Sequence, residues 1–339
     1  MPGARAPLRV EEDLPYLATR PPPLVMRDCR SPRRVPSSPP ALTPRDLKRL
    51  NIIAERKKPS PPLPSEGGSV HSERYRGDLS AQAMSSKGVA LVTGAAQGIG
   101  RGVALRLAED GFDVAINDIP DKSAELDTLV EEIQQKQRKS SKHLADVSQE
   151  ESVKEMVVEV VKAHGGLDVM VANAGIAGPW TSLVGGTPPL HRSISAEQWD
   201  KVMAVNARGT FLCYKHAGLQ MIAQGRGGRI IGASSYAGKM AVALQSVYST
   251  SKFAIRGLTQ AAALEFGPHG ITVNAVAPGM IVTPMLTEAL KEAAEQAETL
   301  LEKMKSASPL NKLGTPEDIA GLVSFLASKE SQFITGSHV

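Results

Sequence analysis

Tyr248 and Lys252 are four residues apart in a stretch with helical spacing, so one helix face can carry both side chains. A free tyrosine has a pKa of about 10 and is a poor acid or base at neutral pH. A nearby lysine cation stabilises the phenolate and lowers that pKa. The pair therefore predicts proton transfer to or from a substrate oxygen. Taken alone, the same spacing is more often an ordinary surface pair.

A second group of residues has the chemistry of an anion site. Gly94, Gly98 and Gly100 lie between an apolar run over residues 89–93 and an amphipathic stretch over residues 99–110. Glycines at a strand-to-helix turn let the backbone approach a pyrophosphate, and the helix N-terminus offers free amides and a positive dipole end. The loop, which includes Gln97 and Ile99, predicts a dinucleotide cofactor. A plain structural turn is the alternative.

The choice of cofactor depends on Asp118, which ends the next apolar run, 18 residues after Gly100. A carboxylate at this position accepts hydrogen bonds from the ribose hydroxyls of NAD and repels the extra phosphate of NADP. Gln97 is neutral where an arginine or lysine would favour that phosphate. We therefore expect NAD as the favoured cofactor, with NADP as the alternative. Asp118 could instead only cap the turn before Pro120.

The elements that must position these residues alternate along the chain to about residue 280. Short apolar runs predict strands, and the amphipathic stretches between them predict helices. This alternation predicts an α/β fold, a single doubly wound Rossmann-type domain over residues 86–339 with a parallel sheet and helices on both faces. The first predicted strands cover residues 89–93, 114–117, 142–145 and 167–172, and the helices between them cover residues 99–110, 122–137 and 151–164.

Residues 1–85 differ in character from the rest. They hold 15 of the 24 prolines, and 15 Lys and Arg stand against 9 Asp and Glu. Proline fixes φ and lacks the backbone donor, so this arm is predicted to be disordered. A solvated tail, or sequence absent from the mature protein, is the simplest interpretation. A targeting leader, an anchor for acidic surfaces and a proline-motif ligand are the alternatives.

The loop spacing Gly-x-x-x-Gly-x-Gly resembles that of the short-chain dehydrogenase/reductase family, and the resemblance covers nearly all of residues 87–336. Two further matches follow the third and fourth predicted strands, and a last one follows residue 277. The resemblance implies that these positions contact the adenine, support the central sheet and hold the nicotinamide amide. The residues concerned are Asp146, Val147, Asn173, Ala174, Gly175, Pro278, Gly279, Ile281 and Thr283.

The resemblance also implies a catalytic set of Asn206, Ser235, Tyr248 and Lys252. Ser235 lies 13 residues before Tyr248, a spacing at which family members place the serine that orients the substrate carbonyl. Ser234 is the competing candidate. Asn206 matches an asparagine that holds a proton-relay water, and the lysine also bonds the ribose of the cofactor. The implied reaction is hydride transfer between nicotinamide and a secondary alcohol or ketone.

The substrate is less defined. The stretch from Tyr248 to Thr259 resembles acetoin/diacetyl reductases, and 3-oxoacyl-carrier-protein reductases and polyol dehydrogenases are similar too. The first subgroup usually has tryptophan where this chain has Leu286. The segment over residues 180–192 is long and lies near the expected site entrance. A mobile lid is expected within residues 280–312, helical over residues 286–304.

Composition excludes several other classes. Residues 86–339 carry 24 Lys and Arg against 26 Asp and Glu, which argues against nucleic acid as a partner. No apolar run of about 18 residues predicts a membrane span, and the scattered histidines predict no metal. Two distant cysteines favour a reducing compartment, so we expect a cytoplasmic protein. The expected partner is a small carbonyl or alcohol substrate. Organelle targeting by the arm stays open.

Two expectations concern assembly and activity. The resemblance implies a homo-oligomer, a tetramer or dimer. Family members usually follow the Ile334-Thr335-Gly336 segment with a last strand containing Asp-Gly-Gly, which this chain lacks up to Val339. An exposed sheet edge is therefore expected, which would impair oligomer assembly and activity. The alternative of another class is a catalytically silent NAD-binding protein whose arm is its working part.

Overall fold

The computed structural model describes residues 86–184, 193–293 and 297–339. The predicted arm over residues 1–85 and most of the long segment before residue 193 lie outside the described residues. Six strands form one parallel sheet in the order β3-β2-β1-β4-β5-β6. The strands are β1 Val89–Thr93, β2 Asp113–Asp118, β3 Ser140–Leu144, β4 Val169–Ala172, β5 Gly228–Ala233 and β6 Ile271–Val276.

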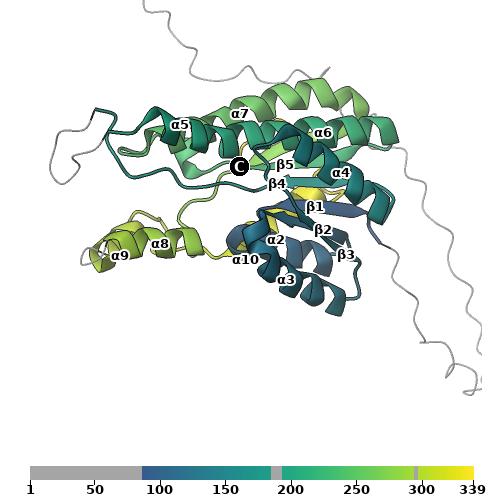
Figure 1. Cartoon of the computed structure of the whole chain (residues 1–339), viewed down its shortest axis with the longest axis horizontal. Helices are drawn as coiled ribbons and strands as arrows, with labels where there is room; N and C mark the ends of the chain where they lie inside the picture. Colours follow the sequence, from purple (N-terminus) through teal and green to yellow (C-terminus); the bar gives the residue numbers. More distant parts are fainter. Residues whose placement is uncertain (1–85, 185–192, 294–296) are drawn as a thin grey trace, which may run out of the picture. The chain divides into compact units, whose positions relative to one another are not determined.

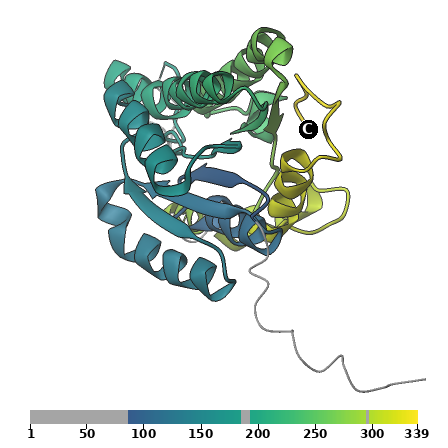
Figure 2. The ribbon, with the colours of Figure 1, turned by 90° about the vertical axis from the view of Figure 1, so that its right-hand side faces the viewer.

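Helices cover both faces of this sheet, which confirms the predicted α/β Rossmann-type fold (Figures 1 and 2). Helices α2, α3 and α10 pack on one face, and helices α4, α6 and α7 pack on the other. The described helices are α2 Gly98–Glu109, α3 Ser123–Gln135, α4 Glu150–His164, α5 Ala196–Met203, α6 Gly209–Gln224, α7 Ser246–Phe266, α8 Pro284–Ala293, α9 Ala297–Ser306 and α10 Pro316–Ala327.

The central strands β1 and β4 are largely apolar because both faces of the sheet are covered. Successive side chains of a strand point to opposite faces, so Leu91 joins the core under α4 and α6, whereas Ala90 and Val92 join the core over α2 and α10. β1 and β6 are buried at every position. The predicted strands are shifted in two places: β3 begins at Ser140 rather than at residue 142, and β4 begins at Val169 rather than at residue 167.

The predicted exposed edge at β6 is not found. The Gly336 amide donates to the Val273 carbonyl at 2.8 Å, the Ala275 amide donates to the Ser337 carbonyl at 2.9 Å, and the Val339 amide donates to the Ala275 carbonyl at 2.9 Å. Residues 336–339 therefore run parallel to β6 and cover its outer edge. This prediction was wrong because a short polar segment has no strand-like hydrophobic pattern, yet its backbone can still pair.

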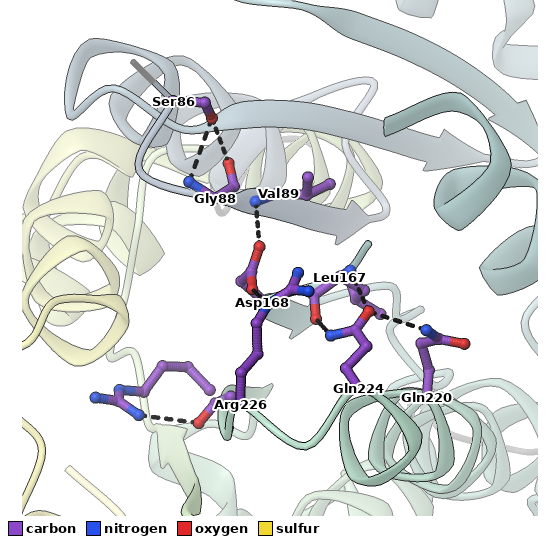
Figure 3. A network of polar contacts seen from close by, with 10 residues as sticks. Ser86, Gly88, Val89, Leu167, Asp168, Gln220, Gln224 and Arg226 are labelled. Atoms are coloured by element: carbon purple, nitrogen blue, oxygen red, sulfur yellow. Dashed lines mark hydrogen bonds and ion pairs between the residues drawn. The ribbon is translucent and has the colours of Figure 1, made fainter. Parts of the chain in front are cut away.

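The amino-terminal edge of the sheet is closed by polar side chains (Figure 3). The Asp168 carboxylate accepts the Val89 amide at 2.8 Å and the Arg226 guanidinium at 2.8 Å. The Gln224 carboxamide accepts the Leu167 amide and donates to the Leu167 carbonyl, both at 2.8 Å. These bonds satisfy the first amide of β1 and the backbone groups of Leu167 just before β4.

None of the helices in the described part of the chain combines the length and the apolar composition needed to span a bilayer.

Candidate functional site

A cavity of about 600 Å³ opens at the carboxyl ends of the strands. In an open parallel sheet, ligands bind at this edge, outside the point where the strand order reverses. Here the reversal lies between β1 and β4. Every residue that the sequence nominated lines this cavity except Asn206: Gly94, Gln97, Gly98, Ile99, Gly100, Asp118, Asp146, Val147, Asn173, Ala174, Gly175, Ser235, Tyr248, Lys252, Pro278, Gly279, Ile281 and Thr283.

The glycine loop needs its glycines. Gly94 has φ +65°, and a Cβ there would lie 2.8 Å from the Ala174 Cα. A Cβ on Gly100 would collide with the Gly94 carbonyl oxygen. Gln97 precedes α2 and makes no side-chain cap for it, so the first amides of the helix are left for a ligand. The loop therefore fits a pyrophosphate held against backbone.

Thr93 and Asn173 fix this loop to the centre of the sheet. The Thr93 hydroxyl accepts the amides of Asn173 and Ala174, both at 3.1 Å. The Asn173 carboxamide donates to the carbonyls of Thr93 at 3.0 Å and Gly94 at 3.2 Å. Asn173 thus joins the ends of β1 and β4, as the family resemblance implied. Sequence reasoning overlooked the side chain of Thr93, a fully buried hydroxyl at the end of a strand.

The position of Asp118 is compatible with both roles predicted from the sequence, which are capping the turn and contacting a cofactor. Its carboxylate accepts the Ala96 amide at 3.1 Å and the Ile119 amide at 2.9 Å, so it caps the turn. It also lines the cavity, next to the glycine loop. Lys122, which the sequence did not single out, lines the same end, and its ammonium pairs with Glu125 at 2.9 Å.

Helix α7 places Tyr248 and Lys252 in the wall of the cavity, and Ser235, which follows β5, lines the same cavity. The Ser234 hydroxyl is buried and donates to the Lys252 carbonyl at 2.9 Å, so it is occupied in holding α7. Ser235 accepts the Ala237 amide at 3.1 Å. A hydrogen bond from Ser235 also favours the phenolate of Tyr248. This geometry favours Ser235 over Ser234 as the residue beside the substrate oxygen.

Burial changes the titration of both α7 residues. Desolvation raises the pKa of Tyr248, and the bond with Ser235 only partly opposes it. Burial lowers the pKa of Lys252 to about 8. The expected lowering of the Tyr248 pKa by Lys252 is not seen in this structure. The Lys252 ammonium donates to the Ala233 carbonyl at 2.8 Å and lies 5.6 Å from the centre of the Tyr248 ring.

Asn206 stands behind the cavity in a π-helical turn, Ala204–Arg208. Its Oδ1 accepts the Ile176 amide at 2.8 Å, and its Nδ2 donates to the Ser251 hydroxyl at 3.1 Å. Ser251 in turn donates to the Tyr248 carbonyl at 2.7 Å. A Cβ on Gly175 would lie 3.2 Å from Asn206 Oδ1 and 3.4 Å from the Lys252 ammonium. Asn206 and Lys252 therefore approach the same glycine.

Ser251 is a residue whose part in the site sequence reasoning missed, because we interpreted it as packing. Its bond to the carbonyl three residues earlier follows the usual habit of serine in a helix. Its bond to Asn206, 45 residues away, has no signal in the sequence. Within the described residues, no group of three or more His, Cys, Asp or Glu side chains is placed to hold a metal ion.

The segment after β6 forms the remaining wall. Thr283, Met285 and Leu286 line the cavity from the start of α8, and Met304 lines it from α9. The base of this segment is pinned, since the Val282 amide donates to the Gly314 carbonyl at 2.9 Å and the Gly314 amide donates to the Met280 carbonyl at 2.9 Å. The described residues of the predicted helix over residues 286–304 are helical, in α8 and α9, and residues 294–296 between them lie outside the described part. Lid movement stays a prediction.

Known proteins are similar to this chain in both sequence and fold. The profile of a family described as enoyl-(acyl carrier protein) reductase matches residues 94–339. A short-chain dehydrogenase/reductase of Armillaria gallica is 50% identical over 264 residues, 77% of this chain and 97% of that protein. A 3-oxoacyl-[acyl-carrier-protein] reductase of Staphylococcus aureus is 42% identical over 250 residues, 74% of this chain and 94% of that protein.

Among solved structures, levodione reductase matches with a TM-score of 0.70 and 30% identity over 75% of this chain and 95% of that one. NAD⁺-bound xylitol dehydrogenase matches with a TM-score of 0.68 and 30% identity over 75% of this chain and 97% of that one. The fold and the site define a Rossmann-type oxidoreductase. The chain belongs to the short-chain dehydrogenase/reductase family and is an NAD(P)-dependent oxidoreductase of that family.

Proposed function

We propose that this protein interconverts a ketone and a secondary alcohol, with Tyr248 as the general acid and base. The observation that carries the proposal is the arrangement of Ser235, Tyr248 and Lys252 in one wall of the cavity whose other end is the glycine loop. A reacting oxygen between Ser235 and Tyr248 would meet two hydroxyls. Such a placement is what general acid–base chemistry at a carbonyl requires.

The cofactor fits the residues present. Side chains at Gly94 or Gly100 would occupy the space next to the backbone that a pyrophosphate would use. Asp118 would bind the adenosine ribose, Asp146 and Val147 the adenine, and Pro278, Gly279, Ile281 and Thr283 the nicotinamide amide. When bound, the nicotinamide supplies the hydride for reduction of the carbonyl carbon or accepts it in oxidation.

The protein side of the reaction is then proton transfer and positioning. Tyr248 donates its hydroxyl proton to the carbonyl oxygen in reduction, and its phenolate removes the proton in oxidation. Ser235 orients the oxygen. Lys252, with a pKa of about 8, is largely protonated at neutral pH. Its ammonium donates to the Ala233 carbonyl in this structure and would favour the phenolate form of Tyr248 once it turned toward the phenol oxygen. Asn206 holds the start of α7 through Ser251 and, as the resemblance implies, carries the proton path to Lys252.

We propose NAD as the preferred cofactor. Support comes from the position of the Asp118 carboxylate, which two backbone amides hold beside the glycine loop. Gln97 adds no positive charge there. Of the cations that line this end, Lys122 already pairs with Glu125 at 2.9 Å. A 2′-phosphate would therefore meet the fixed negative charge of Asp118 beside the glycine loop.

For the substrate, a small diketone such as diacetyl is one candidate from the sequence. The names of the relatives suggest others, because they include a reductase of 3-oxoacyl carriers, a xylitol dehydrogenase and a levodione reductase. These names share a carbonyl or a secondary alcohol and differ in everything attached to it. They support the reaction type, and the choice among these substrates depends on the residues that line the cavity.

The test is oxidation of NADH and of NADPH by the purified chain with diacetyl, acetoin, an acetoacetyl thioester and ketoses. We expect turnover with NADH, reduced at least 100-fold by Tyr248→Phe while NADH still binds. The matched control is Tyr214→Phe, which removes a core hydroxyl bonded to Thr259 and should retain turnover. Turnover that survives Tyr248→Phe would overturn the proposal. NADH binding without turnover of any substrate would favour the catalytically silent alternative.

A further inference from the structure

The charged side chains that line the cavity are unevenly distributed. All but one lie at the end formed by β2, β3 and α5: Asp118, Lys122, Asp146 and Lys201. Asp146 and Lys201 also border a second hollow on that side, together with residues of the turn before α6. Among the described residues at the Tyr248 end, Lys252 is the only charged one, and its ammonium is bonded to the Ala233 carbonyl.

The Tyr248 end is instead lined by large apolar side chains. They come from three separate segments of the chain and are Trp180, Val242, Met280, Met285, Leu286 and Met304. Trp180 remains 40% exposed, Met280 39% and Met285 44%. Single exposed apolar residues are ordinary, but several around one cavity mouth form a surface for an apolar ligand. Methionines also adapt their shape to what they contact.

We propose that the substrate of this site is a neutral ketone or secondary alcohol with a predominantly apolar body, larger than a four-carbon diketone. This inference rests on the proposed function and specifies its substrate class. Each methylene buried against the rim tightens binding about fourfold. A carboxylate or phosphate at this end would lose its hydration without gaining a partner cation among the described residues, which is unfavourable.

A polyol fits this end less well. Every buried hydroxyl needs a hydrogen-bond partner, and beyond Ser235 and Tyr248 the rim offers chiefly the Gln245 carboxamide and the Tyr236 hydroxyl. Among the described residues, the cations that line this cavity lie at the opposite end, apart from Lys252, whose ammonium is bonded to the Ala233 carbonyl. The apolar substrate is therefore the better match.

The experiment compares three ketones that share a methyl ketone group: 2-butanone, 2-octanone and 7-oxooctanoate, which is 2-octanone with a terminal carboxylate. With NADH and the full chain, we expect kcat/KM for 2-octanone to exceed that for 2-butanone by at least 50-fold, as four extra buried methylenes imply. The value for 7-oxooctanoate should be at least tenfold below that for 2-octanone. Equal values for the three ketones, or a preference for the carboxylate, would overturn the inference.

A variant pair tests the rim directly. Met285→Lys places a cation at the mouth, and the ratio of kcat/KM for 2-octanone to that for 7-oxooctanoate should fall at least tenfold. Val282→Lys is the matched control, because Val282 is 52% exposed in the same segment but does not line the cavity. If both variants change the ratio equally, the rim does not select the substrate and the inference fails.

A binding measurement separates this inference from the proposed function. Trp180 lines the mouth, and quenching of its fluorescence by the ketones reports occupancy without turnover once Trp199 is replaced by phenylalanine. Tighter binding of 2-octanone than of 7-oxooctanoate by a chain that does not oxidise NADH would sustain the apolar site and reject the proposed reaction. Turnover without this preference would reject the apolar site alone.

Discussion

The two ends of the same parallel sheet meet very different surroundings. At the amino-terminal end, Asp168 bonds the first amide of β1, and Gln224 bonds the backbone of Leu167 just before β4 (Figure 3). At the carboxyl end, the strands run into glycine-containing turns that border a cavity of about 600 Å³. The helices and the core are shared, so the difference arises in the connecting segments alone.

The comparison shows how one sheet separates stability from binding. Backbone groups beyond the strand ends need partners. At the amino-terminal end, side chains supply these partners permanently. At the carboxyl end, Gly94 and Gly100 keep side chains away, and the first turn of α2 has no side-chain cap. A bound ligand can then supply the hydrogen-bond partners that the protein does not provide. Sites of this kind collect groups with a perturbed pKa, such as Lys252.

The largest effect is expected from closing the open end. Gly100→Ala places a Cβ against the Gly94 carbonyl oxygen, so the loop must move. We expect the Kd for NADH to rise at least 100-fold, since loss of two good hydrogen bonds to a charged group is on the order of 3 kcal/mol. Titration of NADH fluorescence measures this.

Gly257→Ala is the control for that change. Gly257 lies within α7, and its Cβ would meet nothing within 4 Å. An alanine in a helix is favoured over glycine by roughly 0.5–1 kcal/mol, so this variant should bind NADH normally and unfold at a slightly higher urea concentration. Equal loss of NADH binding in both variants would show that the glycine loop is not the cofactor site.

The next effect comes from opening the closed end. Asp168→Ala leaves the Val89 amide without its acceptor, and we expect the free energy of unfolding to fall by about 2–3 kcal/mol. NADH affinity of the folded protein should not change. Arg226→Met removes only the half-exposed ion pair and should cost less than about 1 kcal/mol. Equal losses in urea unfolding would assign the stability to the ion pair instead.

A third prediction concerns the cost in folding stability of the buried Lys252 cation at the open end. Burial lowers the pKa of Lys252 from 10.5 to about 8. Below pH 8 both states are protonated, and the folded state bears the full cost of the buried cation. Between pH 8 and 10.5 the unfolded state holds more protons, so stability should rise with pH.

Lys252→Met should therefore be inactive yet more stable than the unchanged protein at pH 7, by about 2 kcal/mol. The difference should shrink as pH approaches 10.5, because the unchanged protein then no longer carries a buried charge. Urea unfolding at pH 7, 8, 9 and 10 checks both points. A methionine variant that is less stable at pH 7 would mean that the bond to the Ala233 carbonyl outweighs desolvation.

The smallest effect concerns cofactor choice. Asp118→Asn removes the negative charge but retains one oxygen for the amides of Ala96 and Ile119. We expect the ratio of kcat/KM with NADPH to that with NADH to rise about tenfold, equivalent to 1.4 kcal/mol. Asp146→Asn, which also lines the cavity, should change the ratio less. An unchanged ratio for Asp118→Asn would leave that residue as a turn cap only.

Much of the open end could be predicted because its signals are local. The apolar runs of β1 and β2 predict buried strands, and the glycines between β1 and α2 predict a turn that approaches an anion. The spacing of Tyr248 and Lys252 places them on one helix face whatever surrounds the helix. The start of β3 was missed by two residues, since Ser140 and Ser141 belong to an edge strand and lack an apolar pattern.

The closed end and the fine structure of the site could not be predicted in this way. Asp168 and Val89 are 79 residues apart, and Asn206 and Ser251 are 45 apart. No periodicity reports on such pairs, because each depends on how separate elements pack. The pairing of residues 336–339 with β6 is another case, since backbone groups of any short segment can complete a sheet edge.

The sequence by itself therefore determined the layered α/β fold and the glycine turn. Local spacing and hydrophobic pattern suffice for these, because strands and helices repeat over a few residues. The proposed acid–base pair followed from the family resemblance, because its spacing alone is more often an ordinary surface pair. Only the tertiary structure decided that the Ser234 hydroxyl bonds the Lys252 carbonyl, where the Lys252 ammonium points and that apolar side chains from distant segments line the cavity. Those outcomes depend on burial and on contacts between distant segments, which arise only when the elements are packed together.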